Sequence, residues 1–152
     1  MDYFDPFGRP FWTVVGVAIL CGSIVGLERQ VRGKPSGVRT SILVCLGTAV
    51  FIHLGSAISG PGSDPTRVLG QLVTGIGFLG AGVMFSRHGV VSGVTTAAVI
   101  WVMAAIGASI GLGRYTGAIA LSVVIVGVLI GVELLESSAR WFTHGVHRQG
   151  ED

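Results

Sequence analysis

Long apolar stretches alternate along the chain with short polar segments that are rich in glycine, proline and charged residues. A helix needs about 20 predominantly apolar residues to cross the hydrocarbon core of a bilayer. The apolar stretches approach or reach that length, and the segments between them carry residues that break helices. The pattern therefore predicts five transmembrane helices, over about residues 11–27, 40–59, 67–85, 94–112 and 117–135.

The composition supports an integral membrane protein. Half of the 152 residues are hydrophobic, only 12% are charged, and the mean hydropathy is +0.74. Soluble domains carry about 25% charged residues. The net charge of +2 is too small to indicate nucleic-acid binding, so the lipid bilayer is the expected partner. We expect an all-α membrane protein with an N-terminal lead over 1–10, a transmembrane domain over 11–135 and a tail over 136–152.

The third predicted helix contains the run Gly75-Ile76-Gly77-Phe78-Leu79-Gly80-Ala81-Gly82. Dinucleotide-binding turns share its Gly-x-Gly-x-x-Gly pattern, but they need a preceding strand and an acidic residue about 20 positions on. The next acidic residue here is Glu133. Because small residues let helices in a membrane approach closely, we interpret the run as a packing helix that other helices surround. Its predicted contact positions are Gly75, Gly77, Gly80 and Gly82, and Gly-xxx-Gly pairs predict further contact faces at Gly22 and Gly26 and at Gly107 and Gly111.

Basic residues predict the orientation of the five spans, because cytoplasmic loops carry an excess of Lys and Arg. Seven of the ten basic residues fall on the side that holds the first loop, the third loop and the C-terminus. We therefore expect the N-terminus outside and the C-terminus in the cytoplasm.

Polar groups near the ends of the spans are the candidates for function. Glu28, Arg29 and Arg39 flank the predicted mouth between the first two helices. Asp64 and Arg67 stand at the outer start of the third helix. Thr95 and Thr96 open the fourth helix.

Oxygen ligands of this kind suit a hard cation such as Mg2+, and Asp64 is a weak candidate for a metal ligand. Its simpler role is to cap the third helix, because a carboxylate there accepts amide hydrogens that have no other partner. Glu28 should lie on the opposite side of the membrane, so the two acids cannot share one ion. The simpler role of Glu28 is an interfacial ion pair with Arg29, Arg32 or Arg39. No catalytic triad, metal-ligand spacing or phosphate loop is visible, so we expect neither an enzyme nor a bound cofactor beyond Mg2+ as a ligand or transported ion.

Several motifs together resemble the MgtC/SapB family. They occur in the family's order and spacing over about residues 12–135: Gly26-Leu27-Glu28-Arg29, Gly37-Val38-Arg39-Thr40, Asp64-Pro65-Thr66-Arg67-Val68, the glycine run, and Gly93-Val94-Thr95-Thr96-Ala97-Ala98 with Trp101. The resemblance implies a multi-pass protein of the bacterial inner membrane that is linked to growth at low Mg2+ and, in some pathogens, to survival inside phagocytes. It adds Thr40 and Trp101 to the candidate residues. Members are often described as Mg2+ transporters, and virulence-type members look like regulators that restrain the F-type ATP synthase.

The chain departs from the virulence-type pattern at His88, Thr95 and Val102, and only a short tail follows its last predicted helix. The resemblance therefore supports the membrane core more strongly than it supports ATP-synthase inhibition. We expect a protein of Mg2+ homeostasis that regulates through helix–helix contacts, with a second copy or another membrane protein as partner. The alternative is a transporter or channel for Mg2+ or another cation, which would need a polar path through the bundle.

Overall fold

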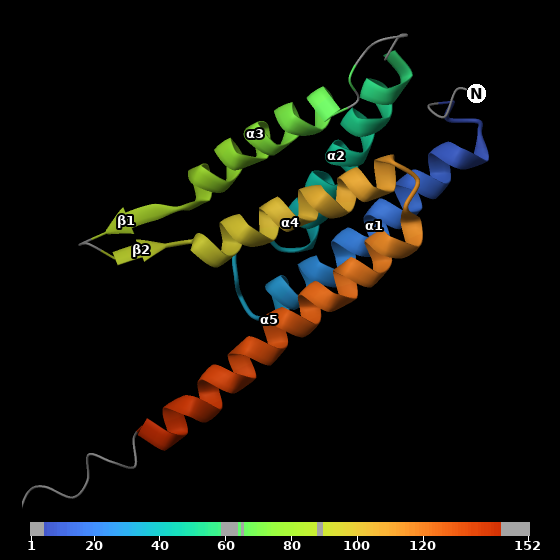
Figure 1. The fold of residues 1–152 in the computed structure, drawn as a ribbon. Helices are drawn as coiled ribbons and strands as arrows, with labels where there is room; N and C mark the ends of the chain where they lie inside the picture. Colours follow the sequence, from blue (N-terminus) through green and yellow to red (C-terminus); the bar gives the residue numbers. More distant parts are fainter. Residues whose placement is uncertain (1–4, 59–63, 65, 88–89, 144–152) are drawn as a thin grey trace, which may run out of the picture.

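The structure is a computed structural model that describes residues 5–58, 64, 66–87 and 90–143. Over these ranges the chain forms five helices and one two-stranded hairpin (Figure 1). All five helices are long and apolar enough to cross a membrane, which confirms the predicted number of spans. The orientation of the termini stays a prediction. The helices are α1 (Arg9–Val31), α2 (Val38–Ile58), α3 (Thr66–Val83), α4 (Val94–Gly111) and α5 (Tyr115–Thr143).

Two helices extend well beyond their apolar stretches. Helix α1 continues through Glu28 and Arg29, which the sequence placed in a loop, and it ends before Gly33, where φ is +62°. Helix α5 continues past Glu133 and Glu136 to its end at Thr143. The apolar pattern ends earlier because it records contact with lipid, whereas Glu, Arg and Ser can continue a helix until a residue such as glycine or proline breaks it.

The segment between α3 and α4, predicted as a plain loop, contains an antiparallel hairpin. Strand β1 (Phe85–Arg87) pairs with β2 (Val90–Ser92), and Phe85 lies opposite Ser92. Gly93 follows with φ of +88°, a left-handed conformation that glycine adopts without steric cost. The hairpin therefore ends directly at the start of α4.

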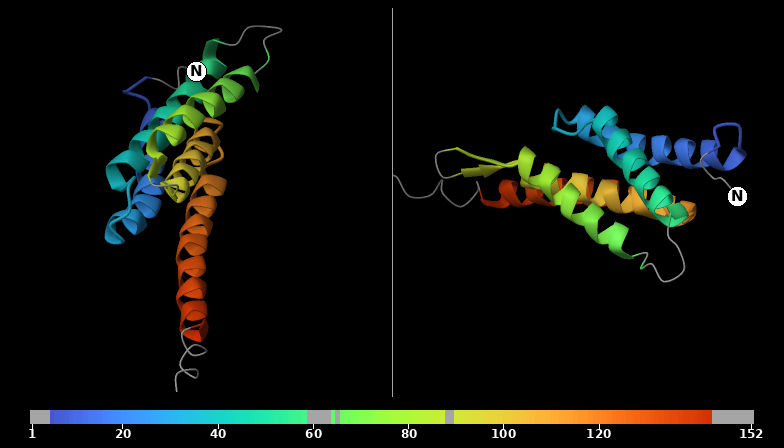
Figure 2. Two further views of the ribbon diagram at one scale, coloured as in Figure 1. Left: turned by 90° about the vertical axis from the view of Figure 1, so that its left-hand side faces the viewer. Right: turned by 90° about the horizontal axis from the view of Figure 1, so that it is seen from above.

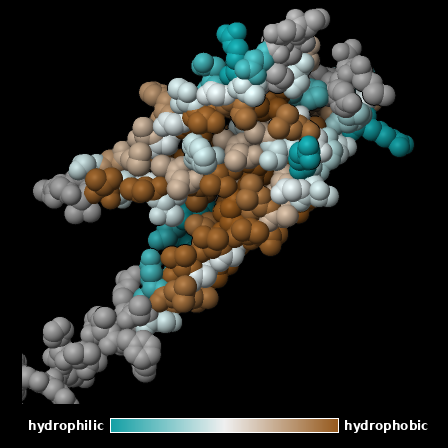
Figure 3. All heavy atoms as spheres, in the orientation of Figure 1, coloured by the Kyte–Doolittle hydropathy of each residue, from teal (hydrophilic) through white to brown (hydrophobic). Residues whose placement is uncertain are grey.

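The core of the bundle lies between α1, α2, α4 and α5. Its fully buried side chains include Cys21, Val25, Cys45, Met103 and Ile106, and both cysteines are free thiols. Most of the large exposed side chains are also apolar, and Figure 3 shows a broad hydrophobic surface along the helices, as lipid contact requires.

Two glycine pairs allow the helices of this core to cross closely. A Cβ atom on Gly22 would lie 2.6 Å from the Cα atom of Ile42 in α2. A Cβ atom on Gly111 would lie 2.6 Å from the carbonyl oxygen of Ala49, and one on Gly107 would overlap the carbonyl oxygen of Cys45. The contact faces predicted for these pairs are therefore present, between α1 and α2 and between α2 and α4.

Helix α3 corrects the prediction made for the glycine run. Figures 1 and 2 show α3 at the edge of the bundle, where it packs against α4 and, less extensively, against α2. A Cβ atom on Gly80 would lie 3.6 Å from the Cβ atom of Ala97 in α4, but one on Gly75, Gly77 or Gly82 would meet nothing within 4 Å. The sequence predicted a helix surrounded by others. Residue spacing indicates which residues share a face of a helix, but it does not place a partner on that face.

Candidate functional site

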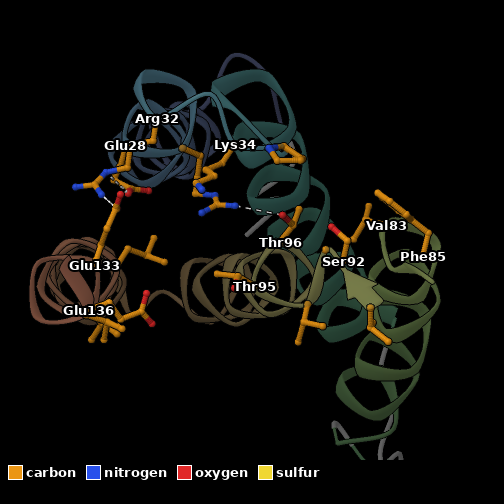
Figure 4. Close-up of a pocket in the computed structure, with 18 residues that line it drawn as sticks. Glu28, Arg32, Lys34, Val83, Phe85, Ser92, Thr95, Thr96, Glu133 and Glu136 are labelled. Carbon is orange, nitrogen blue, oxygen red and sulfur yellow. Dashed lines mark hydrogen bonds and ion pairs between the residues drawn. The ribbon is translucent and has the colours of Figure 1, made fainter. Parts of the chain in front are cut away.

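A polar pocket of about 690 Å3 lies where the end of α1, the start of α4, the hairpin and the second half of α5 converge (Figure 4). Three basic and three acidic side chains line it, together with Thr95 and Thr96. In Figure 3 a hydrophilic recess separates the hairpin from α5 within the otherwise apolar surface. The charged residues of the pocket are Glu28, Arg29, Arg32, Lys34, Glu133 and Glu136.

Arg32 joins the two acidic sides of the pocket. It stands four residues after Glu28 on α1, so the two side chains share one face, and its Nε atom lies 2.8 Å from Oε1 of Glu28. Its Nη1 atom pairs with a carboxylate oxygen of Glu133 on α5. Arg32 therefore links α1 to α5 through two ion pairs. The side chain of Glu28 is only 6% exposed, so this partner matters more to Glu28 than to Glu133, which is 54% exposed.

Arg29 connects α1 to α4. It is buried, with 4% of its surface exposed, and its Nη2 atom donates a hydrogen bond of 3.2 Å to Oγ1 of Thr96. Helix α4 begins after Gly93 without a side-chain cap. The first amides of a helix have no partner within the helix, and this end carries a partial positive charge. The guanidinium of Arg29 therefore lies beside the positive end of α4.

Two apolar grooves flank α3. The groove between α2 and α3 has a volume of about 640 Å3, and its polar margin includes Arg39, Thr40 and Gln71. The groove between α3 and α4 has a volume of about 330 Å3 and contains Trp101, which is 51% exposed. Both grooves contain mainly aliphatic side chains, so they suit apolar chains or helices rather than ions.

Asp64 caps α3 as predicted. Its Oδ1 atom accepts hydrogen bonds from the amide of Thr66 at 2.9 Å and from the hydroxyl of Thr66 at 2.7 Å. These bonds lower the pKa of the Asp64 carboxyl, because they favour the charged form. Arg67 forms no ion pair with Asp64 in the part of the chain that the structure describes. Pro65, which follows Asp64 in the motif, lies outside that part.

The structure separates the predicted site residues into four places. Glu28, Arg29, Thr95 and Thr96 meet in the polar pocket, whereas Arg39 and Thr40 line the apolar groove instead of the mouth beside Glu28. Asp64 and Arg67 lie at the opposite end of the bundle, as expected, and Trp101 lies in the smaller groove. Among the described residues no three His, Cys, Asp or Glu side chains are placed to hold a metal ion, so Asp64 has no set of fellow ligands there.

Four of the six charged groups in the pocket were not predicted as site residues: Arg32, Lys34, Glu133 and Glu136. Of the three arginines predicted as ion-pair partners of Glu28, the structure pairs it with Arg32, which stands four residues further along α1. No signal in the sequence places Glu133 beside Arg32, because α5 reaches α1 only through the tertiary fold.

These features define a multi-pass α-helical membrane protein with a charged pocket at one end of its bundle. The chain belongs to the MgtC family, because the sequence pattern of that family matches residues 15–138. It is 46% identical over 134 residues to "Protein MgtC" of Salmonella typhimurium, which covers 88% of this chain and 56% of that protein. It is 45% identical over 111 residues to "Protein MgtC" of Brucella abortus, which covers 73% of this chain and 46% of that protein.

A third relative is "Putative magnesium transporter YhiD" of Escherichia coli, 47% identical over 105 residues, which cover 64% of this chain and 48% of that protein. The chain thus spans about half the length of the curated relatives it matches. No solved structure matches it.

Proposed function

We propose that this protein acts in Mg2+ homeostasis or adaptation to low Mg2+, as a regulatory membrane protein of the bacterial inner membrane that works through helix–helix contacts. Its family and the name of the Escherichia coli relative support the link to Mg2+. The partner would be another membrane protein or a second copy of the chain. The face of α3 that the bundle leaves uncovered supports the regulatory role.

The uncovered surface of α3 carries small residues on two sides. Gly77 shares an exposed face with Gly70 and Ala81, whereas Gly75, two residues away, lines the groove between α2 and α3. A Cβ atom on Gly75 or Gly77 would meet nothing within 4 Å. A second helix can approach such a face closely enough for continuous van der Waals contact. By contrast, Gly22 and Gly107 already lie against another helix of the same chain.

The interior of the bundle supports regulation over conduction. Most buried side chains among the described residues are aliphatic or sulfur-containing, such as Val25, Cys45 and Met103. The polar residues that are buried as a whole in this part of the chain include no carboxylate; they are Arg29, Ser41, Thr48, Thr96 and Ser122. A Mg2+ path would need oxygen ligands and retained water along its length. The competing function, transport of Mg2+ or another cation, draws support from the relative's name and from the three carboxylates of the polar pocket.

Two measurements separate these functions. The first is Mg2+ uptake into proteoliposomes that contain the purified protein, with empty liposomes as control. We expect uptake equal to the control, and uptake clearly above it would favour the transporter. The second is growth at low Mg2+ of cells that depend on this protein, with variants on the uncovered face of α3.

The variant Gly77→Leu should leave the stability of the isolated chain unchanged, because nothing lies within 4 Å of a Cβ atom there. It should abolish growth at low Mg2+, because the larger side chain would push away a partner helix. Gly127→Leu on α5, where a Cβ atom also meets nothing within 4 Å, is the matched control and should support growth. Normal growth with Gly77→Leu would rule out a contact at this position.

A further inference from the structure

The polar pocket holds two buried groups of opposite charge whose hydrogen bonding is incomplete. Among the described residues, Nε of Arg29 and Oε2 of Glu28 have no hydrogen-bond partner. Arg29 is 4% exposed and the side chain of Glu28 is 6% exposed. Buried polar atoms in native proteins nearly always have partners, so a ligand that supplies both an acceptor and a donor would complete this pocket.

The acceptor group of such a ligand would lie beside Arg29. This guanidinium has no ion pair with any described residue, and its hydrogen bond to Thr96 holds it at the start of α4. The uncapped start of α4 lines the same pocket and adds partial positive charge beside the guanidinium. Lys34 adds a further positive group to the lining. An anion with several oxygens would offset the desolvation of the buried guanidinium and could bind both it and the amides, as phosphate groups do at helix N-termini.

The donor group of the ligand would lie on the side of the pocket that carries the carboxylates. Arg32 already pairs with Glu28 through Oε1 and with Glu133, which leaves Oε2 of Glu28 for a further donor. Glu136 lies on the same side of the pocket, and Figure 4 shows it extending from α5 toward α4. A primary ammonium has three N–H donors and a positive charge, so it can bind both carboxylates.

The remaining lining is mostly apolar, and part of it belongs to a membrane span. Val128, Leu129 and Val132 of α5 line the pocket within the span Tyr115–Ser138, and Phe85 and Val94 line it from the hairpin side. Ligand pockets that combine a few fixed polar groups with apolar walls typically have volumes of about 300–1,000 Å3. We propose that this pocket binds the headgroup of a phospholipid that carries both a phosphate and a primary ammonium, with the phosphate at Arg29, Lys34 and the start of α4 and the ammonium at Glu28 and Glu136. This site does not depend on the regulatory role of α3.

Lipid binding to the full chain in detergent tests the site. Native mass spectrometry would compare phosphatidylethanolamine, phosphatidylcholine and phosphatidylglycerol with identical acyl chains, and thermal unfolding would compare the same lipids with inorganic phosphate. Phosphatidylethanolamine should bind about tenfold more tightly than the other two, because choline has no N–H donor and glycerol has no positive charge. Equal binding of the three lipids would overturn the proposal. A shift of the unfolding midpoint by inorganic phosphate as large as that by phosphatidylethanolamine would assign the site to free phosphate instead.

Variants then place the headgroup in this pocket. Lys34→Gln should weaken phosphatidylethanolamine binding about two- to fivefold, and Glu136→Gln should reduce its preference over phosphatidylglycerol by a similar factor. Arg29→Gln should weaken binding about tenfold or more, and the two exposed positions decide the matter if that variant does not fold. Arg114→Gln, at an exposed basic residue outside the pocket, is the matched control. Unchanged binding in both Lys34→Gln and Glu136→Gln would show that the lipid binds elsewhere.

Discussion

The charged residues of this protein differ in burial, and the more deeply a charge is buried, the more its stability depends on an ion-pair partner. Arg32 forms ion pairs with two carboxylates: that of Glu28 is nearly buried, and that of Glu133 is half exposed. A buried charge that loses its partner keeps the full cost of desolvation, whereas an exposed charge is rehydrated by water. The two ion pairs of Arg32 should therefore contribute unequally to stability.

Arg32→Gln should lower the free energy of unfolding by about 2–4 kcal/mol, because it leaves the buried carboxylate of Glu28 without its positive partner. Glu133→Gln should cost no more than about 1 kcal/mol, because Glu133 is 54% exposed. Thermal or denaturant unfolding in detergent measures both changes. Equal costs for the two variants would contradict the unequal burial of the two carboxylates.

The cap at Asp64 gives a second prediction at this scale. Asp64→Asn should keep the stability of α3, because the amide oxygen still accepts the hydrogen bond from Thr66, whereas Asp64→Ala should lower it by removing the cap. If growth at low Mg2+ fails with Asp64→Asn while stability is kept, the charge itself matters for function. Normal growth would assign Asp64 to capping alone.

The same carboxyl predicts a dependence on pH. Its pKa is lowered in the folded state by the hydrogen bonds from Thr66, so its stabilising effect is fully present above the ordinary value of 3.8 and is lost as the pH falls through the folded value. The effect should be small, because Asp64 is exposed. Unfolding midpoints from pH 6 down to about pH 3 should fall slightly more for the natural protein than for Asp64→Asn. Identical acid profiles would contradict the lowered pKa.

At the scale of the helix, equal glycine spacings have different surroundings. Gly107 and Gly111 in α4 and Gly127 and Gly131 in α5 are both Gly-xxx-Gly pairs. The first pair faces the backbone of α2, whereas a Cβ atom on either glycine of the second pair would meet nothing within 4 Å. The sequence pattern therefore identifies helices that can pack closely, and the fold decides which of them do so within the chain.

This difference predicts opposite effects of one methyl group. Gly107→Ala should destabilise the protein by about 1–3 kcal/mol, because the added Cβ atom would overlap the carbonyl of Cys45 and force α2 and α4 apart. Gly127→Ala should be neutral or stabilise by up to about 1 kcal/mol, since alanine favours the helix and has free space there. Unfolding midpoints of the two variants provide the measurement, and a tolerated Gly107→Ala would contradict the close crossing.

At the scale of the whole molecule, the ends of the bundle differ in charge. The end of α1, the hairpin and the second half of α5 lie at one end of the bundle, and the turn between α4 and α5 lies at the other (Figure 1). The excess of basic residues predicts that the hairpin end faces the cytoplasm.

Single cysteines test the orientation directly. The background carries alanine at both natural cysteines. Ser92→Cys then places an exposed thiol in the hairpin at one end of the bundle, and Thr116→Cys places one at the start of α5 at the other end. An impermeant thiol reagent added to intact cells should label Thr116→Cys and should label Ser92→Cys only after the cells are opened. The reverse pattern would invert the predicted topology.

The sequence by itself determined the membrane class, the five spans, the family resemblance and local features such as the cap at Asp64. These depend on hydrophobicity, on residue order or on contacts between near neighbours in the chain, and all three can be observed in a sequence. Only the tertiary structure decided that α3 lies at the edge, that Arg39 lies away from Glu28, and that Arg32 meets Glu133. In a membrane every span is apolar on most of its surface, so hydrophobicity does not distinguish a face that contacts lipid from one that contacts a helix. The packing of the helices determines that choice, and it also creates the polar pocket from charges that lie far apart in the sequence.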